Sequence, residues 1–203
     1  MDAISLLEQD HRTVEALFKT FEKLGERAAK QKEKIVRQFT RELAIHAAIE
    51  EMLFYPAVRK AAEAAKQKSL HEAEDTVLES LEEHHIVKWT LAELEKMTAE
   101  DERFEAKVTV LMESVRHHVE EEREELFPKA RRLLGKKLLD ELGERMARAK
   151  KLAPTRPHPR SPDEPPGNYL ASLPAAMMDK GIDLMKGLIN KGKGRENGAD
   201  LDA

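Results

Sequence analysis

The sequence predicts an all-α protein, folded as an up-down-up-down four-helix bundle with a short extra helix, a Pro-rich linker and a C-terminal tail. Three observations favour this class. Residues 1–151 contain only two prolines and three glycines, apolar residues recur at helical spacing through four long segments, and the connections between these segments are short and polar. Short connections place consecutive helices side by side and antiparallel.

The four segments are expected at about residues 2–24, 32–66, 70–97 and 101–133, and a shorter fifth at about 136–151 is expected to cover one end of the bundle. In chain order, their apolar stripes are Ile4–Leu7–Val14–Phe18, Ile35–Phe39–Leu43–Leu53, Val77–Leu81–Val87–Leu91 and Phe104–Val108–Leu111–Val115–Leu126. Each stripe repeats every three or four residues, as one buried face of an α-helix requires.

The chain is predicted to divide into a bundle at 1–151, a Pro-rich linker at 152–169 and a C-terminal part at 170–203. Six of the thirteen residues from Pro154 to Pro166 are proline, which prevents a regular helix and favours an extended, semi-rigid linker. Residues 170–190 form a short amphipathic segment, followed by a polar tail expected to be disordered. This segment is either weakly ordered, docked onto the bundle, or docked onto a partner helix. Its Met and Gly residues make membrane attachment the least favoured role.

Amino-acid composition limits the kinds of metal ligand, membrane contact and nucleic-acid binding that this protein can have. The chain has no cysteine, so a bound metal would need histidine and carboxylate ligands. The N-terminus is acidic where a signal peptide would be basic, and no apolar run approaches the ~20 residues that span a bilayer, so a cytoplasmic protein without stable membrane insertion is expected. A formal net charge of -4 gives no general attraction for nucleic acid.

Two segments carry the same pattern of histidine, glutamate and proline. His46 precedes Glu50 by four residues, as His118 precedes Glu122, and a proline follows each histidine by ten residues. Positions i and i+4 lie on one face of a helix, so each pair presents a nitrogen and an oxygen ligand together.

The other two segments also repeat. Asp10-His11 in the first aligns with Glu83-His84 in the third at an offset of 73 residues, and the His-x-x-x-Glu pairs are offset by 72. A single histidine on an apolar stripe is usually a hydrogen-bonded core residue. The repeat instead favours a bundle with approximate two-fold symmetry, in which His11, His46, His84, His118 and two glutamates converge on one interior point. By the same periodicity, His85 and His117 fall beside the stripes and are expected to lie around the ligands.

Six such ligands exceed what one tetrahedral zinc needs and suit a pair of ions. Glu50 and Glu122 can each bridge two metals, and an added oxo or hydroxo bridge leaves one open position at each octahedral ion. Mixed imidazole and carboxylate ligands favour iron, and fit manganese or zinc less specifically. Without metal, two carboxylates in the core would cost several kcal/mol each.

These motifs resemble the bacterial hemerythrin-like, or HHE cation-binding, family. The matching pieces are Asp10-His11, His46 to Pro56, Glu83-His84 and His118 to Pro128, and the resemblance covers roughly residues 1–135. It implies a four-helix bundle around a non-haem di-iron centre that binds O2 or reacts with peroxide or nitric oxide. The family includes carriers, sensors and iron regulators.

The sequence departs from the respiratory hemerythrins at two positions. Lys88 stands where they have a second histidine, and Glu122 supplies the carboxylate that they place one residue later, where this chain has Arg123. The resemblance therefore implies a centre more open to other ligands than that of an O2 carrier. Tyr55 is a candidate extra ligand, but an ideal helix turns it about 140° from Glu50. An electron-donating phenol near the site and simple packing are the other roles considered for it.

The leading functional hypothesis is a di-iron protein whose open site handles O2, peroxide or nitric oxide. The sequence is compatible both with binding of peroxide or nitric oxide and with their enzymatic turnover. The alternative is a sensor of O2, iron or redox state, in which the metal site controls docking of residues 170–190.

Overall fold

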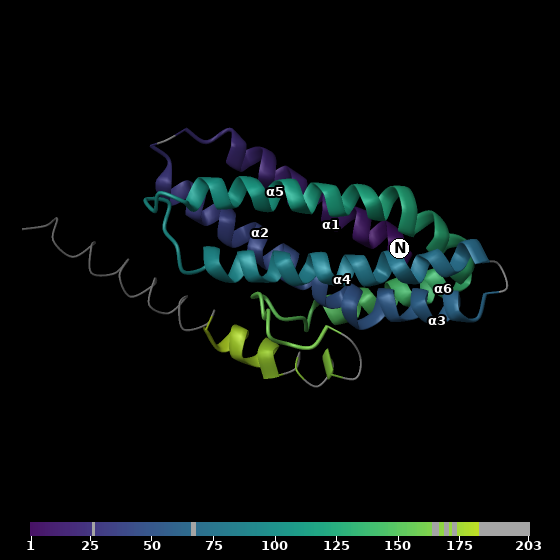
Figure 1. Ribbon diagram of the computed structural model, residues 1–203. Helices are drawn as coiled ribbons and strands as arrows, with labels where there is room; N and C mark the ends of the chain where they lie inside the picture. Colours follow the sequence, from purple (N-terminus) through teal and green to yellow (C-terminus); the bar gives the residue numbers. More distant parts are fainter. Residues whose placement is uncertain (26, 66–67, 164–166, 169–170, 172–173, 183–203) are drawn as a thin grey trace, which may run out of the picture.

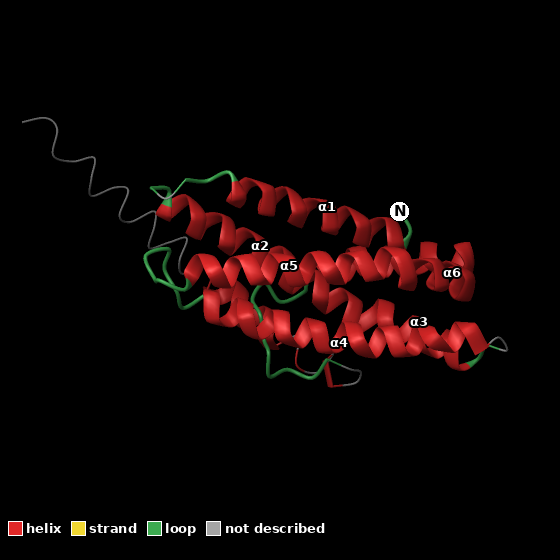
Figure 2. Ribbon diagram, turned by 45° about the horizontal axis from the view of Figure 1, so that its top comes forward, coloured by secondary structure: helices red, strands yellow, loops and turns green. Residues whose placement is uncertain are grey.

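The computed structural model describes residues 1–25, 27–65, 68–163, 167–168, 171 and 174–182, without the side chains of 68–71. These residues are helical or in connections, and none of them forms a strand. Figure 2 shows long helices packed side by side, with loops at their ends and a further loop passing below α4. The predicted all-α helical bundle is confirmed. Most of the predicted tail lies outside the described residues.

The four long helices of the bundle are α1 (Ala3–Glu22), α2 (Ala29–Ile49), α4 (Lys68–Leu94) and α5 (Phe104–Glu121) (Figure 1). After α2 the chain passes through one π-helical turn, η1 (Glu50–Phe54), into α3 (Tyr55–Glu63). After α5 it passes through a second, η2 (Glu122–Leu126), into α6 (Phe127–Lys150). Helical structure therefore runs from Ala29 to Glu63 at the second predicted segment and from Phe104 onward in the fourth, and each contains a wider turn that periodicity did not predict.

The two π-helical turns begin at the predicted glutamate ligands and end just before the two prolines. The Tyr55 N–H donates to the Glu50 carbonyl, and the Phe127 N–H donates to the Glu122 carbonyl, each five residues back. Proline has no N–H, and its ring crowds the carbonyl four residues earlier in an α-helix. A wider turn ahead of Pro56 and Pro128 relieves this conflict, and π turns of this kind are frequent at functional sites.

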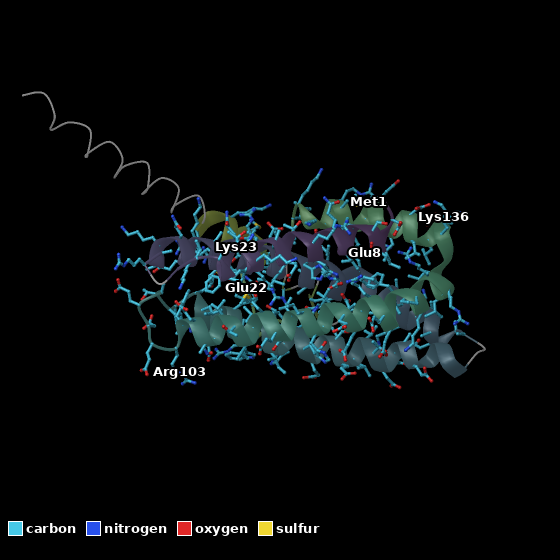
Figure 3. All side chains as sticks on the ribbon, turned by 90° about the horizontal axis from the view of Figure 1, so that it is seen from above. Met1, Glu8, Glu22, Lys23, Arg103 and Lys136 are labelled. Atoms are coloured by element: carbon cyan, nitrogen blue, oxygen red, sulfur yellow. The ribbon has the colours of Figure 1, made fainter. Side chains whose placement is uncertain are left out.

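Helix α6 breaks at Gly135, whose φ of 67° lies in the left-handed region that glycine adopts at little cost. The part after Gly135 corresponds to the predicted fifth segment and packs against α1. A Cβ at Gly143 would stand 2.4 Å from the Met1 carbonyl oxygen, so only glycine allows this close approach. Met1 and Lys136 lie at one end of the bundle, and Lys23 and Arg103 lie at the other (Figure 3).

The buried apolar side chains form two clusters. One includes Ile4, Leu7, Phe54, Val77 and Leu126, and the other includes Val14, Phe18, Phe39, Leu91 and Leu111. On α1, His11 falls between Leu7 of the first cluster and Val14 of the second. The predicted ligands therefore lie in the middle of the bundle, with packed apolar side chains above and below them along its axis.

The described part of the C-terminal region lies against the bundle. We define residues 153–163, Asn168 and 174–182 as the strap. It has no regular helix through its proline-rich part, as predicted. Ala153 and Ala176 are buried, and the fully buried Asp179 accepts hydrogen bonds from the N–H groups of Thr155 and Arg156. The described part of the 170–190 segment is thus docked on its own chain, while the domain boundary near residue 152 stays a prediction. Among the described residues, no helix is long and apolar enough to cross a membrane.

Candidate metal centre

The structure brings the six predicted ligands together in the interior. The Nε2 atoms of His11 and His46 lie 3.2 Å apart, and those of His84 and His118 also lie 3.2 Å apart. Glu50 Oε2 lies 3.0 Å from His46 Nε2, and Glu122 Oε2 lies 3.2 Å from His11 Nε2. Both glutamates are fully buried, and the four histidines are at most 8% exposed.

The cluster divides into two overlapping groups. One contains His11, His46, Glu50 and Glu122, and the other contains Glu50, His84 and His118. Within each group the donor atoms lie within 4.8 Å of one another. Glu50 belongs to both groups, which is the position of a carboxylate that bridges two ions.

The geometry of the donor atoms fits metal ions. Two imidazole nitrogens bound at about 2.1 Å in adjacent octahedral positions stand about 3.0 Å apart, close to the distance in both histidine pairs. Glu50 Oε1 and Glu122 Oε2 are buried without a hydrogen-bond partner. Buried carboxylate oxygens left in this way are costly, and a cation between them would remove the cost.

Three histidines are oriented from behind by carboxylates. Nδ1 of His118 lies 2.7 Å from Glu83 Oε2, and Nδ1 of His84 lies 3.0 Å from Glu51 Oε1. Nδ1 of His46 lies 3.8 Å from Asp10 Oδ2, a longer contact. An ionised carboxylate only accepts, so His84 and His118 donate from Nδ1 and present Nε2 to the centre of the cluster, as in many metal sites. The longer contact of His46 with Asp10 is an electrostatic one, without a hydrogen bond at Nδ1.

Two lysines support these carboxylates, Lys88 buried and Lys150 half-buried. Lys88 Nζ donates to both oxygens of Glu51, at 2.9 and 3.0 Å, and Lys150 pairs with Asp10. Asp10, Glu51 and Glu83 were not predicted as site residues. A signal was present, because an acidic residue directly precedes His11 and His84 and directly follows Glu50.

The structure places His85 and His117, which were expected at the boundary of the stripes or around the ligands, outside the cluster of six residues. His85 accepts a hydrogen bond from Trp89 Nε1 on the exposed face of α4, and the side chain of His117 is 65% exposed beside Glu121. Each follows or precedes a buried histidine by one residue, and one residue is a rotation of about 100° on a helix. The side chains next to the Nδ1 atoms of the histidines are instead three carboxylates, Asp10, Glu51 and Glu83.

Tyr55 points into the cluster. Its hydroxyl donates to Glu122 Oε1 at 3.0 Å, and it lies 3.4 Å from both Glu50 Oε2 and His84 Nε2. The π turn η1 explains this placement, because one wider turn rotates the following residues back toward the face of Glu50. The hydroxyl adjoins His84, a member of the group that has only one carboxylate. Phe127, at the equivalent place in the second repeat, stacks on His11 instead, with ring centroids 6.0 Å apart.

Burial and charge shift the ionisation of the cluster strongly. Burial raises the pKa of Glu50 to about 7, helped by the neighbouring Glu122 carboxylate. Burial acts the same way on Glu122, but His118 and His11 outweigh it and lower the pKa of Glu122. Burial lowers the pKa of His84 to about 4. For His46, burial also favours the neutral form, but Glu50 and Asp10 outweigh it and raise the pKa to about 10.

A cavity of about 710 Å3 reaches the cluster from outside. It opens between α1 and α5, its inner wall includes Val14, Phe18 and Val115, and all four histidines line it. A small molecule in solvent thus has a path to the donor atoms.

Comparison with known proteins identifies the family. Residues 2–130 match the profile of the hemerythrin HHE cation binding domain, which is more than half of the chain. The chain belongs to the hemerythrin HHE family. This family agrees with the resemblance that the sequence motifs indicated. The family and the clusters of histidine and glutamate together suggest metal binding.

Two relatives extend this result. An uncharacterized hemerythrin-like protein of Schizosaccharomyces pombe is 32% identical over 149 residues, which covers 73% of this chain and 70% of that protein. The crystal structure of a hemerythrin HHE cation binding domain-containing protein from Mycobacterium kansasii superposes with a TM-score of 0.62 at 22% identity. The match covers 74% of this chain and 86% of that one, and it supports the HHE fold.

Proposed function

We propose that this protein holds two non-haem iron ions on His11, His46, Glu50, His84, His118 and Glu122, and reacts there with O2, peroxide or nitric oxide. The observation that carries the proposal is the buried six-residue cluster in which Glu50 belongs to two donor groups. Imidazole and carboxylate donors without sulfur favour iron. Bound iron would supply Lewis acidity and redox chemistry.

The surrounding residues favour reaction over simple reversible carriage of O2. The hydroxyl of Tyr55 lies among the donor atoms, within reach of both glutamates. It can act as a ligand or as a nearby donor of a proton and an electron. In the metal-free protein the pKa of Glu50 is raised to about 7, and a metal bound to this carboxylate would displace its proton.

Peroxide gives the most direct test, because its disproportionation needs no separate electron donor. Two molecules of H2O2 yield two of water and one of O2, so one peroxide is oxidised as the other is reduced. The protein should contain about two irons per chain by elemental analysis. It should evolve O2 from H2O2 faster than an equal concentration of free iron. Less than one metal per chain after anaerobic iron loading would refute the site.

A sensor is the second candidate, and one contact favours it. Asn168 Nδ2 in the strap donates to the Glu51 carbonyl at 2.9 Å, and the side chain of Glu51 orients His84. Occupancy of the site could therefore change how the strap docks. Hydrogen exchange of residues 174–182 with and without iron tests this role, and equal exchange in both states would exclude it.

A further inference from the structure

The internal repeat relates two faces of the bundle. It matches α1 with α4 and α2 with α5, so the face between α1 and α5 corresponds to the face between α4 and α2. On the first face the cavity is lined by Glu15, Arg116, Val119, Glu120, Arg123 and Glu124. At offsets of 73 and 72 residues, their counterparts on the second face are Lys88, Ala44, Ala47, Ala48, Glu51 and Met52. All six counterparts line a second, much smaller cavity.

The two faces differ in what covers them. The strap lies on the second face, and its Pro154, Pro157 and Pro162 complete the lining of the second cavity. Figure 1 shows this part of the chain below α4, away from α1. About 50 Å3 remains there, against about 710 Å3 on the open face. The repeat gives two equivalent faces from which the cluster could be reached. The face between α1 and α5 is open, and the face between α4 and α2 is filled by the strap.

The side chains of the open face suit contact with solvent, and those of the covered face suit contact with the strap. The open face carries charged residues that solvent or ion pairs satisfy, such as Arg116, whose guanidinium donates to Glu15 and Glu22. The covered face has three alanines in place of Arg116, Val119 and Glu120, and Ala44 and Ala47 are buried. Alanines allow the proline rings to approach the helix closely. The charges on this face, Lys88 and Glu51, are paired with each other and only 8% and 5% exposed.

Several contacts hold the strap. Arg156 pairs with Glu95 at 2.9 Å, and Arg160 lies over the ring of Trp89. Two buried side chains of the strap add hydrogen bonds. Asp179 binds the N–H groups of Thr155 and Arg156 and lies 3.1 Å from His158 Nε2, which holds the proline-rich part to the helix at 174–182. Asn168 ties the strap to the Glu51 carbonyl within η1, directly behind His84. These contacts hold the strap across the second face.

We propose that the strap closes the second of two pseudo-symmetric approaches to the metal centre, so that, of these two, small ligands use the approach between α1 and α5. The proposal rests on the proposed function, since it defines the path by which that site is reached. It assigns a role to the C-terminal region, which lies beyond residue 130, where the family match ends.

The test closes the open face and then loosens the strap in the full-length protein. Azide is the probe, and its binding to the iron-loaded protein is followed by stopped-flow absorbance. Val119→Trp fills the α1/α5 cavity and should slow azide binding about tenfold or more. Val110→Trp is the matched control, because Val110 is a 59% exposed residue of the same helix that does not line the cavity, and it should leave the rate unchanged.

Loosening the strap should then restore access. Asp179→Ala or Asn168→Ala, combined with Val119→Trp, should return the azide rate toward that of the wild type. Asp101→Ala is the matched control, since Asp101 caps a loop by accepting from the N–H and hydroxyl of Thr98 rather than from the strap. Double variants that stay as slow as Val119→Trp would overturn the proposal, as would a Val119→Trp variant that binds azide at the wild-type rate.

A second measurement does not depend on iron. Hydrogen exchange of the backbone amides of residues 44–52 should accelerate in Asp179→Ala and Asn168→Ala, with or without metal, and stay unchanged in Asp101→Ala. A protein that binds no iron would refute the proposed function while this measurement still reported on the strap. Unchanged exchange at 44–52 in both strap variants would overturn the closure itself.

Discussion

The hydroxyl of Tyr55 lies 3.0 Å from Glu122 Oε1, so a phenol from one half of the repeat contacts the carboxylate ligand candidate of the other half. Burial, together with the two glutamates, raises the pKa of Tyr55 well above its usual value of 10. Without a cation the hydroxyl stays protonated and donates to Glu122. A ferric ion would favour the phenolate, because metal binding displaces the proton of a ligand.

The first prediction follows from this contact. Tyr55→Phe should keep about two irons per chain but lose a visible phenolate-to-iron absorption band, and azide should bind faster to the freed position. Optical spectra and elemental analysis of the two proteins make the comparison. If Tyr55 acts only near the iron, the spectrum will stay constant while the rate of reaction with peroxide changes. Unchanged spectrum and rates would show that Tyr55 only packs.

The second prediction concerns the two donor groups. His46→Ala removes a ligand of the first group, and His118→Ala removes one of the second, so each variant should lose about one metal per chain and the double variant both. Elemental analysis measures the loss. His117→Ala is the matched control, because His117 adjoins His118 in sequence but is exposed. Full metal retention in the double variant would contradict the assignment.

The third prediction concerns the residues behind His84. Glu51→Gln should weaken metal binding about 10- to 100-fold, because His84 loses the carboxylate that orients it. Competition with a chelator gives the affinity. Glu121→Gln, at a half-buried position beside the exposed His117, should have no effect.

The buried pair of Glu51 and Lys88 gives a related expectation. Lys88→Met leaves Glu51 buried without its cation and should cost about 3–5 kcal/mol of unfolding free energy. The Glu51→Gln/Lys88→Met double variant should recover part of that loss, as urea denaturation would measure. Additive losses in the double variant would show that the two residues are not coupled.

The fourth prediction is a pH dependence of the metal-free protein. The pKa of His46 is raised to about 10, above its unfolded value of about 6.5, so its stabilising effect is complete below pH 6.5 and is lost as pH rises through 10. The pKa of Glu50 is also raised, from about 4.5 to about 7, so its stabilising effect is likewise lost as pH rises between these two values. The pKa of His84 is lowered to about 4, so its contribution to stability is lost only as pH falls from about 6.5 toward 4. The melting temperature of the metal-free protein should therefore fall between pH 7 and 10.

The metal-loaded protein should show a much weaker fall, because the metal replaces the proton on His46. Thermal melts of both forms at four pH values test this, with His46→Gln as the variant expected to flatten the metal-free curve. Identical curves for the two forms would mean that the ligands are solvated.

The fifth prediction concerns the close approach of α6 to the N-terminus. Gly143→Ala should cost about 1–3 kcal/mol, because its Cβ would stand 2.4 Å from a backbone carbonyl. Gly181→Ala is the matched control, since no atom lies within 4 Å of a Cβ built there. Chemical denaturation should separate the two variants, and equal stabilities would contradict the packing described here.

The sequence by itself determined the helical bundle and the six converging residues. Helical periodicity is a local property, and the repeat of His-x-x-x-Glu placed His46 with Glu50 and His118 with Glu122 on single faces before any contact was known. The same periodicity separated His84 from His85 as the buried residue of the pair.

Only the tertiary structure decided what stands behind and beside these residues. Tyr55 enters the cluster because a π turn ahead of Pro56 rotates it inward, and an ideal 3.6-residue period has no means to predict that turn. The Glu51 carboxylate in η1 meets the Lys88 ammonium in α4, 37 residues apart in sequence, and the packing of these two elements sets the distance. The strap lies on one of two related faces because alanines there admit its prolines, a fit that depends on the assembled surface rather than on any local pattern.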